Sequence, residues 1–168
     1  MNNAEKIIEH KLPGDSGDPD GKEGWSWNGY WTKVRMDEAL PFPDQFGGDL
    51  VPIVNNDNEC TAQDYVTKEV PVNKYALPPY DAVGKLFFNY FGTDYFATAW
   101  AVKGAEFGIF TAAQCLYNNG LLAEVEKVGW ASKIMFAGQY QRYDSPFPRW
   151  RISRVYIFQG WKNGDGES

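Results

Sequence analysis

Few side chains in this sequence offer acid–base, nucleophilic or metal-binding chemistry. The 168 residues include one histidine, His10, and two cysteines, Cys60 and Cys115. These residues do not have the spacing of a zinc site, so we expect no metal and no cofactor. Cys60 and Cys115 are either the two ends of one disulfide bridge or two buried thiols. His10 lies in a polar segment, where we expect a solvated side chain.

Gln114 occupies the position with the clearest chemical consequence. It follows the apolar run 107-FGIFTAA-113 and precedes Cys115. The amide of glutamine donates and accepts hydrogen bonds but does not titrate near neutral pH. Gln114 therefore cannot take the proton from a serine hydroxyl.

An aromatic cluster near the N-terminus is a second candidate site. Trp25, Trp27, Tyr30 and Trp31 all fall within seven residues. One interpretation is a hydrophobic plug that docks an N-terminal arm onto the body of the protein. The other is a platform of flat faces on which sugar rings stack. The second interpretation makes a glycan a candidate ligand.

Composition and charge narrow the classes of function. The net charge is −6 at pH 7, whereas nucleic-acid binding needs a basic surface, so we expect no nucleic-acid partner. No apolar run approaches the ~20 residues of a membrane-spanning helix. The start, 1-MNNAEKIIEHKLPG-14, has no uninterrupted apolar segment, so no signal peptide is predicted. Aromatic residues make up 17% of the chain, which favours a strand-rich fold.

The pattern along the chain predicts four regions. Residues 1–24 are rich in glycine, proline and acidic residues, which predicts a flexible polar leader. After the leader we expect an arm with a linker, a β domain and a polar tail, over residues 25–78, 79–161 and 162–168.

Local signals predict individual elements within these regions. In the arm, Thr32 is the predicted N-cap of a short helix over residues 33–40, which Pro41 ends. In the β domain, the first two strands form a predicted hairpin with a turn around residues 92–94. The strands are predicted within residues 81–90, 95–102, 107–113, 121–140 and 149–161. Residues 121–127 are alternatively one helical turn.

Taken together, these segments resemble the trypsin-like serine peptidases, and within them the glutamyl-endopeptidase-like group. In that family an apolar strand runs into Thr-Ala-Ala-His-Cys, which residues 111–115 match except at Gln114. A family motif ahead of the mature domain, Trp-Thr-x-x-Arg-Met-x-x-Ala-x-Pro-x-Pro, is matched by residues 31–43. Further matches lie at residues 79–88, at Thr98 and Ala99, at 136–140 and at 160–161.

The resemblance implies a fold and a location. It implies a mostly β chain, with an antiparallel six-stranded barrel of the trypsin-like type over residues 79–161. This would be the first of the family's two barrels, preceded by an extended N-terminal arm that corresponds to a prosegment. The resemblance also implies an extracellular protein.

Several features depart from the family pattern. Gln114 replaces the catalytic histidine, and Ala97 occupies the position of the family's usual disulfide partner. In the family, the catalytic aspartate follows the Gly-Trp pair and the serine lies in the second barrel. Here Asp165 lies in the polar tail, and 15-DSG-17, which is similar to the serine motif, lies in the leader. We therefore expect no peptidase activity.

The sequence predicts a catalytically inactive trypsin-fold homologue that acts as a binding or assembly subunit. A protein partner or a second copy would cover the barrel face that the second barrel covers in the family. One alternative is the N-terminal chain of a processed two-chain protein, whose other chain supplies the second barrel. Another alternative is a carbohydrate-binding module that uses the N-terminal aromatic cluster.

Overall fold

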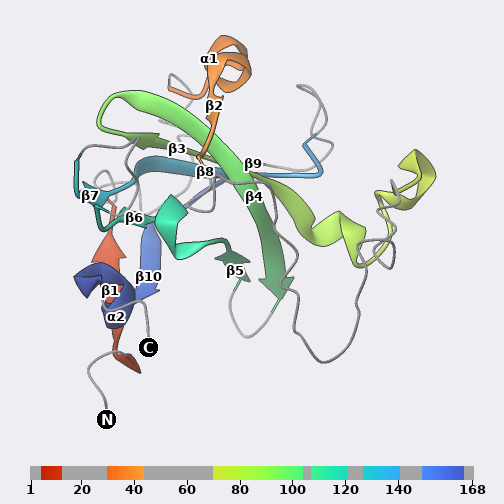
Figure 1. The fold of residues 1–168 in the computed structure, drawn as a ribbon. Coiled ribbons are helices and arrows are strands. Elements are labelled where there is room, and N and C mark those ends of the chain that lie inside the picture. The colour runs from red at the N-terminus through yellow and green to blue at the C-terminus, as the bar shows by residue number, and fades with distance from the viewer. Residues whose placement is uncertain are drawn as a thin grey trace, which may run out of the picture.

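The computed structural model describes residues 5–12, 30–43, 70–103, 107–120, 127–140 and 149–164. Over these ranges the protein is mostly β-structure, which confirms the predicted fold class (Figure 1). The described strands form one six-stranded sheet and two two-stranded sheets. They do not close into a barrel, so the finer prediction of a closed six-stranded barrel is not confirmed.

The strands and helices have the following bounds. The six-stranded sheet contains β2 (Leu40–Pro41), β3 (Val83–Tyr90), β4 (Thr93–Lys103), β5 (Phe107–Phe110), β8 (Ser132–Gly138) and β9 (Arg149–Arg151). The smaller sheets pair β1 (Ile7–Lys11) with β10 (Arg154–Phe158), and β6 (Tyr117–Asn118) with β7 (Gly129–Trp130). The helices are α1 (Lys33–Glu38) and α2 (Gln159–Asn163), with 3₁₀ turns η4 (Val72–Lys74), η5 (Tyr80–Ala82) and η6 (Ala113–Cys115).

The centre of the main sheet is the predicted hairpin, β3 with β4. The two strands pair antiparallel, with Tyr90 opposite Thr93, so a two-residue turn of Phe91 and Gly92 connects them. Both turn residues have positive φ, 50° and 106°, as the tight hairpin turn that follows the strand twist requires. Strand β8 pairs with the other edge of β3. Because β3 occupies one edge of β4, both β2 and β5 lie along the other edge.

Strand β3 separates two hydrophobic core clusters. Its side chains alternate between the faces of the sheet, because a strand has a period of two. Leu86, Phe88 and Tyr90 belong to the first cluster, whereas Phe87 belongs to the second. The second cluster is covered by the arm, which contributes the buried side chains of Trp31, Met36 and Ala39.

The arm contains the predicted helix. The side chain of Thr32 accepts a hydrogen bond from the backbone N–H of Arg35 at 3.3 Å, which confirms Thr32 as the N-cap of α1. After the helix, β2 pairs in parallel with β4 at Leu40 and Pro41. Figure 1 shows α1 on one side of the β3–β4 hairpin and β1, β10 and α2 on the other.

The prediction of a flexible leader is wrong for residues 5–12. Strand β1 pairs antiparallel with β10, with Ile8 opposite Ile157 and His10 opposite Val155. The segment ends at Leu12, which is 3% exposed and belongs to the first core cluster. Four charged side chains within residues 5–12 obscure the alternation of this segment, which forms a strand once β10 is present as a partner.

Two predicted strands also end earlier than expected. The strand predicted to 113 ends at Phe110, and the 3₁₀ turn η6 follows it. The strand predicted over 149–161 is divided into β9 and β10, and its last residues belong to α2. Gly164 stops this helix in the left-handed conformation, with φ 77°, as is common after a helix C-terminus.

Candidate binding groove between strands β5 and β10

Gln114 lies in the middle of η6, the turn that follows β5. The backbone N–H of Cys115 donates to the carbonyl of Ala112 at 3.0 Å, which closes the turn. The hydroxyl of Tyr90 donates to the backbone carbonyl of Gln114, also at 3.0 Å. Burial raises the pKa of Tyr90, so this hydroxyl remains a donor at neutral pH. The turn is therefore fixed by the core hairpin, but it presents an amide where the resemblance expects an imidazole.

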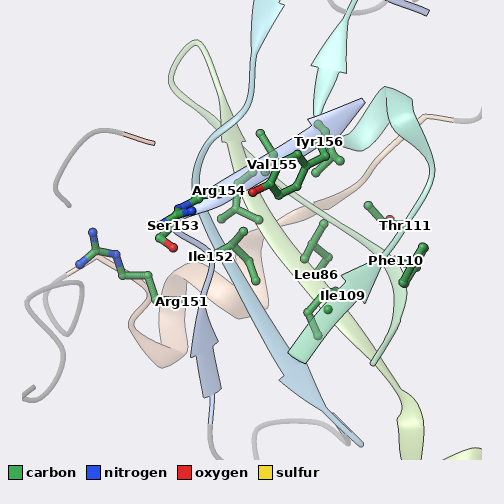
Figure 2. Close-up of a pocket in the computed structure, with 13 residues that line it drawn as sticks. Leu86, Ile109, Phe110, Thr111, Arg151, Ile152, Ser153, Arg154, Val155 and Tyr156 are labelled. Atoms are coloured by element: carbon green, nitrogen blue, oxygen red, sulfur yellow. The ribbon is translucent and has the colours of Figure 1, made fainter. Parts of the chain in front are cut away.

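A cavity of about 540 Å³ opens beside this turn. On one side its wall is the β5–η6 segment, and on the other side it is the end of β9 together with β10 (Figure 2). The floor is apolar. The lining residues are Leu86, Gly108, Ile109, Phe110, Thr111, Leu116, Ile134, Arg151, Ile152, Ser153, Arg154, Val155 and Tyr156. We refer to this cavity as the β5–β10 groove.

The floor of the β5–β10 groove is part of the protein's own core. Leu86, Ile134 and Val155 belong to the first core cluster and are at most 4% exposed. Ile109 and Ile152 pack against the same cluster from opposite walls, and Figure 2 shows both between the two walls. A side chain that enters the groove therefore meets core residues directly.

The strands in the two walls, β5 and β10, each pair with a described strand on one edge only. Within the described ranges, β5 pairs only with β4, and β10 pairs only with β1. Each strand therefore has one edge that no described strand occupies. Edges of this kind are templates on which an additional strand can pair.

The rim of the groove carries exposed aromatic side chains. Phe110 is 54% exposed and Tyr156 is 52% exposed. Trp100, on the neighbouring strand β4, stacks on Phe110 with ring centroids 6.3 Å apart. On β10, Phe158 lies on the same face as Tyr156, and its partner across the β1–β10 pair is the exposed Ile7. Exposed apolar side chains therefore lie on both walls of the groove and continue along β10 beyond it.

The charge around the groove differs from that of the whole chain. Arg151 and Arg154 line it, and the described residues of its lining include no aspartate or glutamate. The guanidinium group of Arg151 points away from the apolar side chains in Figure 2. Two cationic side chains therefore lie at the groove, on a chain with a net charge of −6.

The predicted aromatic site is only partly described. Trp25 and Trp27 lie outside the described residues. Trp31 is 4% exposed, and its ring packs against Tyr30 and Phe87 with centroids 5.2 and 5.5 Å away. Its indole N–H donates to the carbonyl of Lys133 at 2.6 Å. These contacts are those of a docked plug, and they leave no open face of Trp31 for a sugar ring.

Tyr30 joins a polar network that ties the arm to the hairpin. Its hydroxyl donates to Asp94 Oδ1, and the amide of Asn89 donates to the same carboxylate oxygen at 2.7 Å. Arg35 Nη1 lies 2.8 Å from Asp94 Oδ2. Burial, and next the hydrogen bond to Asp94, raise the pKa of Tyr30 to about 12. Sequence reasoning missed Asn89 and Asp94 because their shared partner Tyr30 lies 59 and 64 residues earlier in the chain.

His10 is not the solvated side chain that the sequence predicted. Its ring stacks on Trp130, with centroids 4.3 Å apart and an interplanar angle of 5°. Burial, and to a lesser extent the charge of Lys162, lower the pKa of His10 from its usual 6.5. The ring of His10, the only histidine of the chain, therefore packs strand β1 against β7.

The remaining predicted positions fall partly outside the described residues. Cys115 is 3% exposed in the first core cluster, whereas Cys60 is not described, so their disulfide stays a prediction. The run 14-GDSG-17 matches the family's serine motif at all four positions, not only over its last three. Ser16 and Asp165 also lie outside the described residues. A test of activity therefore has to include Ser16.

Comparison with known proteins gives no match to this chain: neither a family model, nor a curated protein, nor a solved structure is similar enough. The trypsin-like resemblance therefore rests on the sequence motifs. In the described part of the chain, no helix has the length and apolar character needed to cross a membrane. The same residues contain no group of three or more His, Cys, Asp or Glu side chains that could hold a metal ion.

Proposed function

We propose that this chain is a catalytically inactive homologue of the trypsin-like serine peptidases, of the glutamyl-endopeptidase-like group, and that it acts as a binding or assembly subunit. Gln114 supports the loss of activity, because an amide cannot act as the general base of a serine nucleophile. His10, the one other candidate base, is stacked on Trp130.

The β5–β10 groove is the observation that carries the binding role. Its floor consists of core residues, and its rim consists of exposed Phe110 and Tyr156. Apolar surface of this kind gains about 25 cal/mol for each Å² that a partner removes from water. Contiguous exposed apolar side chains beside a cavity are typical of interaction sites.

The unfilled strand edges suggest how a partner binds. In this proposal β3, β4, β5, β8, β9 and β10 are the strands of a six-stranded barrel of the trypsin-like type that is open between β5 and β10. A partner closes this opening, either with an extended segment or with a domain that covers the rim. The partner can be another protein or a second copy of the chain.

The proposal is tested by measuring the mass of the purified chain by size-exclusion chromatography with light scattering. We expect an assembly larger than one chain. In the double variant Phe110→Ser/Tyr156→Ser, we expect a folded single chain. Removing two aromatic side chains from an interface costs roughly 3 kcal/mol, which is about 100-fold in the dissociation constant.

The matched control is Val34→Ser. Val34 is 60% exposed on α1 and does not line the groove, so this variant should retain the mass of the wild type. A wild-type chain that is well folded and remains a single chain contradicts self-association, and it leaves another protein as the one partner that the proposal allows. An assembly that survives the double variant shows that the groove is not its interface.

A further inference from the structure

A second cavity, of about 500 Å³, lies on the other face of the sheet. Lys85 lines it, whereas the adjacent Leu86 lines the β5–β10 groove, so the two cavities are on opposite faces of β3. Tyrosines form much of its wall. Its principal side chains are Tyr75, Tyr80, Lys85, Thr98, Gln139 and Tyr140.

The walls of this cavity are tied to the sheet. The side-chain amide of Gln139 donates to the carbonyl of Tyr75 at 2.8 Å, which connects the segment before β3 to the end of β8. The backbone N–H of Gln139 donates to the carbonyl of Val83 at 2.9 Å. The cavity therefore does not depend on a ligand to bring its walls together.

Lys85 is the one cationic side chain among the described residues that line the cavity. Its Nζ lies 3.8 Å from the centroid of the Phe96 ring and 5.2 Å from that of Tyr140. Within the described ranges no carboxylate forms an ion pair with Lys85; the ion pair found in these ranges joins Arg35 to Asp94. Aromatic faces attract an ammonium group, but more weakly than a carboxylate at hydrogen-bonding distance does.

The position of the Lys85 ammonium group costs free energy of hydration, and packing alone does not explain why a lysine is found there. Lys85 is half-buried, and burial lowers its pKa because the charged form loses contact with water. A methionine would pack against Phe96 without this penalty. A bound anion would offset the penalty, because it would replace the lost water with an opposite charge.

We propose that this cavity binds a small ligand that carries a carboxylate on a flat apolar ring. The ring packs among Tyr75, Tyr80 and Tyr140, and the carboxylate pairs with the ammonium group of Lys85. The volume and mainly apolar lining suit a ligand of one or two fused rings. The exposed Thr98, opposite Lys85 on β4, places a hydroxyl beside the same position.

The test uses 2-naphthoate and its neutral counterpart 2-naphthamide as probes, with binding measured by isothermal titration calorimetry. We expect saturable binding of 2-naphthoate at roughly 1 mM or tighter. The variant Lys85→Met should weaken this binding by about ten-fold or more, which is the loss of one charge-assisted contact. Binding of 2-naphthamide should be the same in both proteins within about two-fold.

Two further variants distinguish binding in the cavity from a general attraction of the anionic probe to lysine side chains. Val83→Trp places a large ring at the cavity wall and should weaken both probes. Lys162→Met removes an exposed lysine that does not line the cavity and should leave both affinities unchanged. The proposal is overturned if the wild type does not bind 2-naphthoate, if both probes bind it equally, or if Lys85→Met has no effect.

Discussion

The backbone of Gln114 and the ring of His10 are both held in place by contacts with the body of the protein. The turn that holds Gln114 is closed by the N–H of Cys115 and fixed by the hydroxyl of Tyr90, so its position depends on the core rather than on a substrate. His10 stacks on Trp130 and holds strand β1 near β7. Both side chains lie in ordered surroundings, and in neither case does the described structure pair them with a nucleophile.

The first prediction concerns activity. The purified wild type should hydrolyse neither a glutamyl peptide nor a glutamyl ester above background, because loss of a triad base costs on the order of 10⁴-fold. Gln114→His should remain inactive, since no described side-chain hydroxyl is hydrogen-bonded to the side chain of Gln114. The control is Ser16→Ala. Hydrolysis by the wild type that Ser16→Ala abolishes would identify a working serine and refute the inactive assignment.

The pH dependence of stability offers a second prediction at this scale. His10 is the only histidine, so its pKa can be read from one set of imidazole signals in an NMR titration. We expect a pKa below 6.5, because burial and then Lys162 disfavour the charged ring. The folded-state pKa is lowered, so His10 stabilises the fold above pH 6.5, and this contribution is lost as the pH falls through the folded pKa.

Two variants check the causes of the His10 shift. Lys162→Gln should raise the pKa of His10 part of the way towards 6.5, because it removes the charge of Lys162 and leaves the ring as buried as before. Trp130→Ala should raise it further, because it opens the stacked ring to water. A pKa at or above 6.5 in the wild type would show that the ring is solvated, as the polar sequence around it had suggested.

At the scale of single elements, short-range patterns were sufficient for the hairpin and for α1. Alternation on both sides of Gly92 predicted β3 and β4, and Thr32 before a run of helix formers predicted the helix. The pairing of β1 with β10 joins Ile8 to Ile157, and nothing in the sequence near Ile8 indicates so distant a partner. Closure of a barrel depends on the angles between strands, which no local pattern contains.

Gly84 provides the clearest prediction about an element. An added Cβ would lie 2.4 Å from the carbonyl oxygen of Ala137 on β8, so β3 and β8 approach more closely than a side chain allows. Gly84→Ala should lower the free energy of unfolding by about 1–3 kcal/mol, measured by denaturant titration.

The matched control for this variant is Gly108→Ala in β5. There an added Cβ meets its nearest atom, in Phe110, at 3.7 Å, which is ordinary contact distance. Its stability should therefore remain close to that of the wild type. Equal stability of Gly84→Ala and Gly108→Ala would mean that β3 and β8 are further apart than described.

At the scale of the whole molecule, the arm packs on one face of the main sheet, beside the cavity lined by Lys85, whereas the other face opens into the β5–β10 groove. The arm places Trp31 and Met36 on the second core cluster and fastens itself through Tyr30 and Arg35 to Asp94. On the opposite face, the first core cluster forms the floor of the β5–β10 groove. This asymmetry is the structural basis of the proposed binding role.

Backbone hydrogen exchange at β5 tests this account most directly, because β5 has one edge that no described strand occupies. Exchange is followed by mass spectrometry in the assembled wild type and in Phe110→Ser/Tyr156→Ser, with β3 as the internal reference because β4 and β8 flank it. We predict that amides over residues 107–111 exchange more slowly in the assembly, while those of β3 are equally protected in both. Assembly with unchanged exchange at β5 would contradict the account, because the partner would then bind elsewhere.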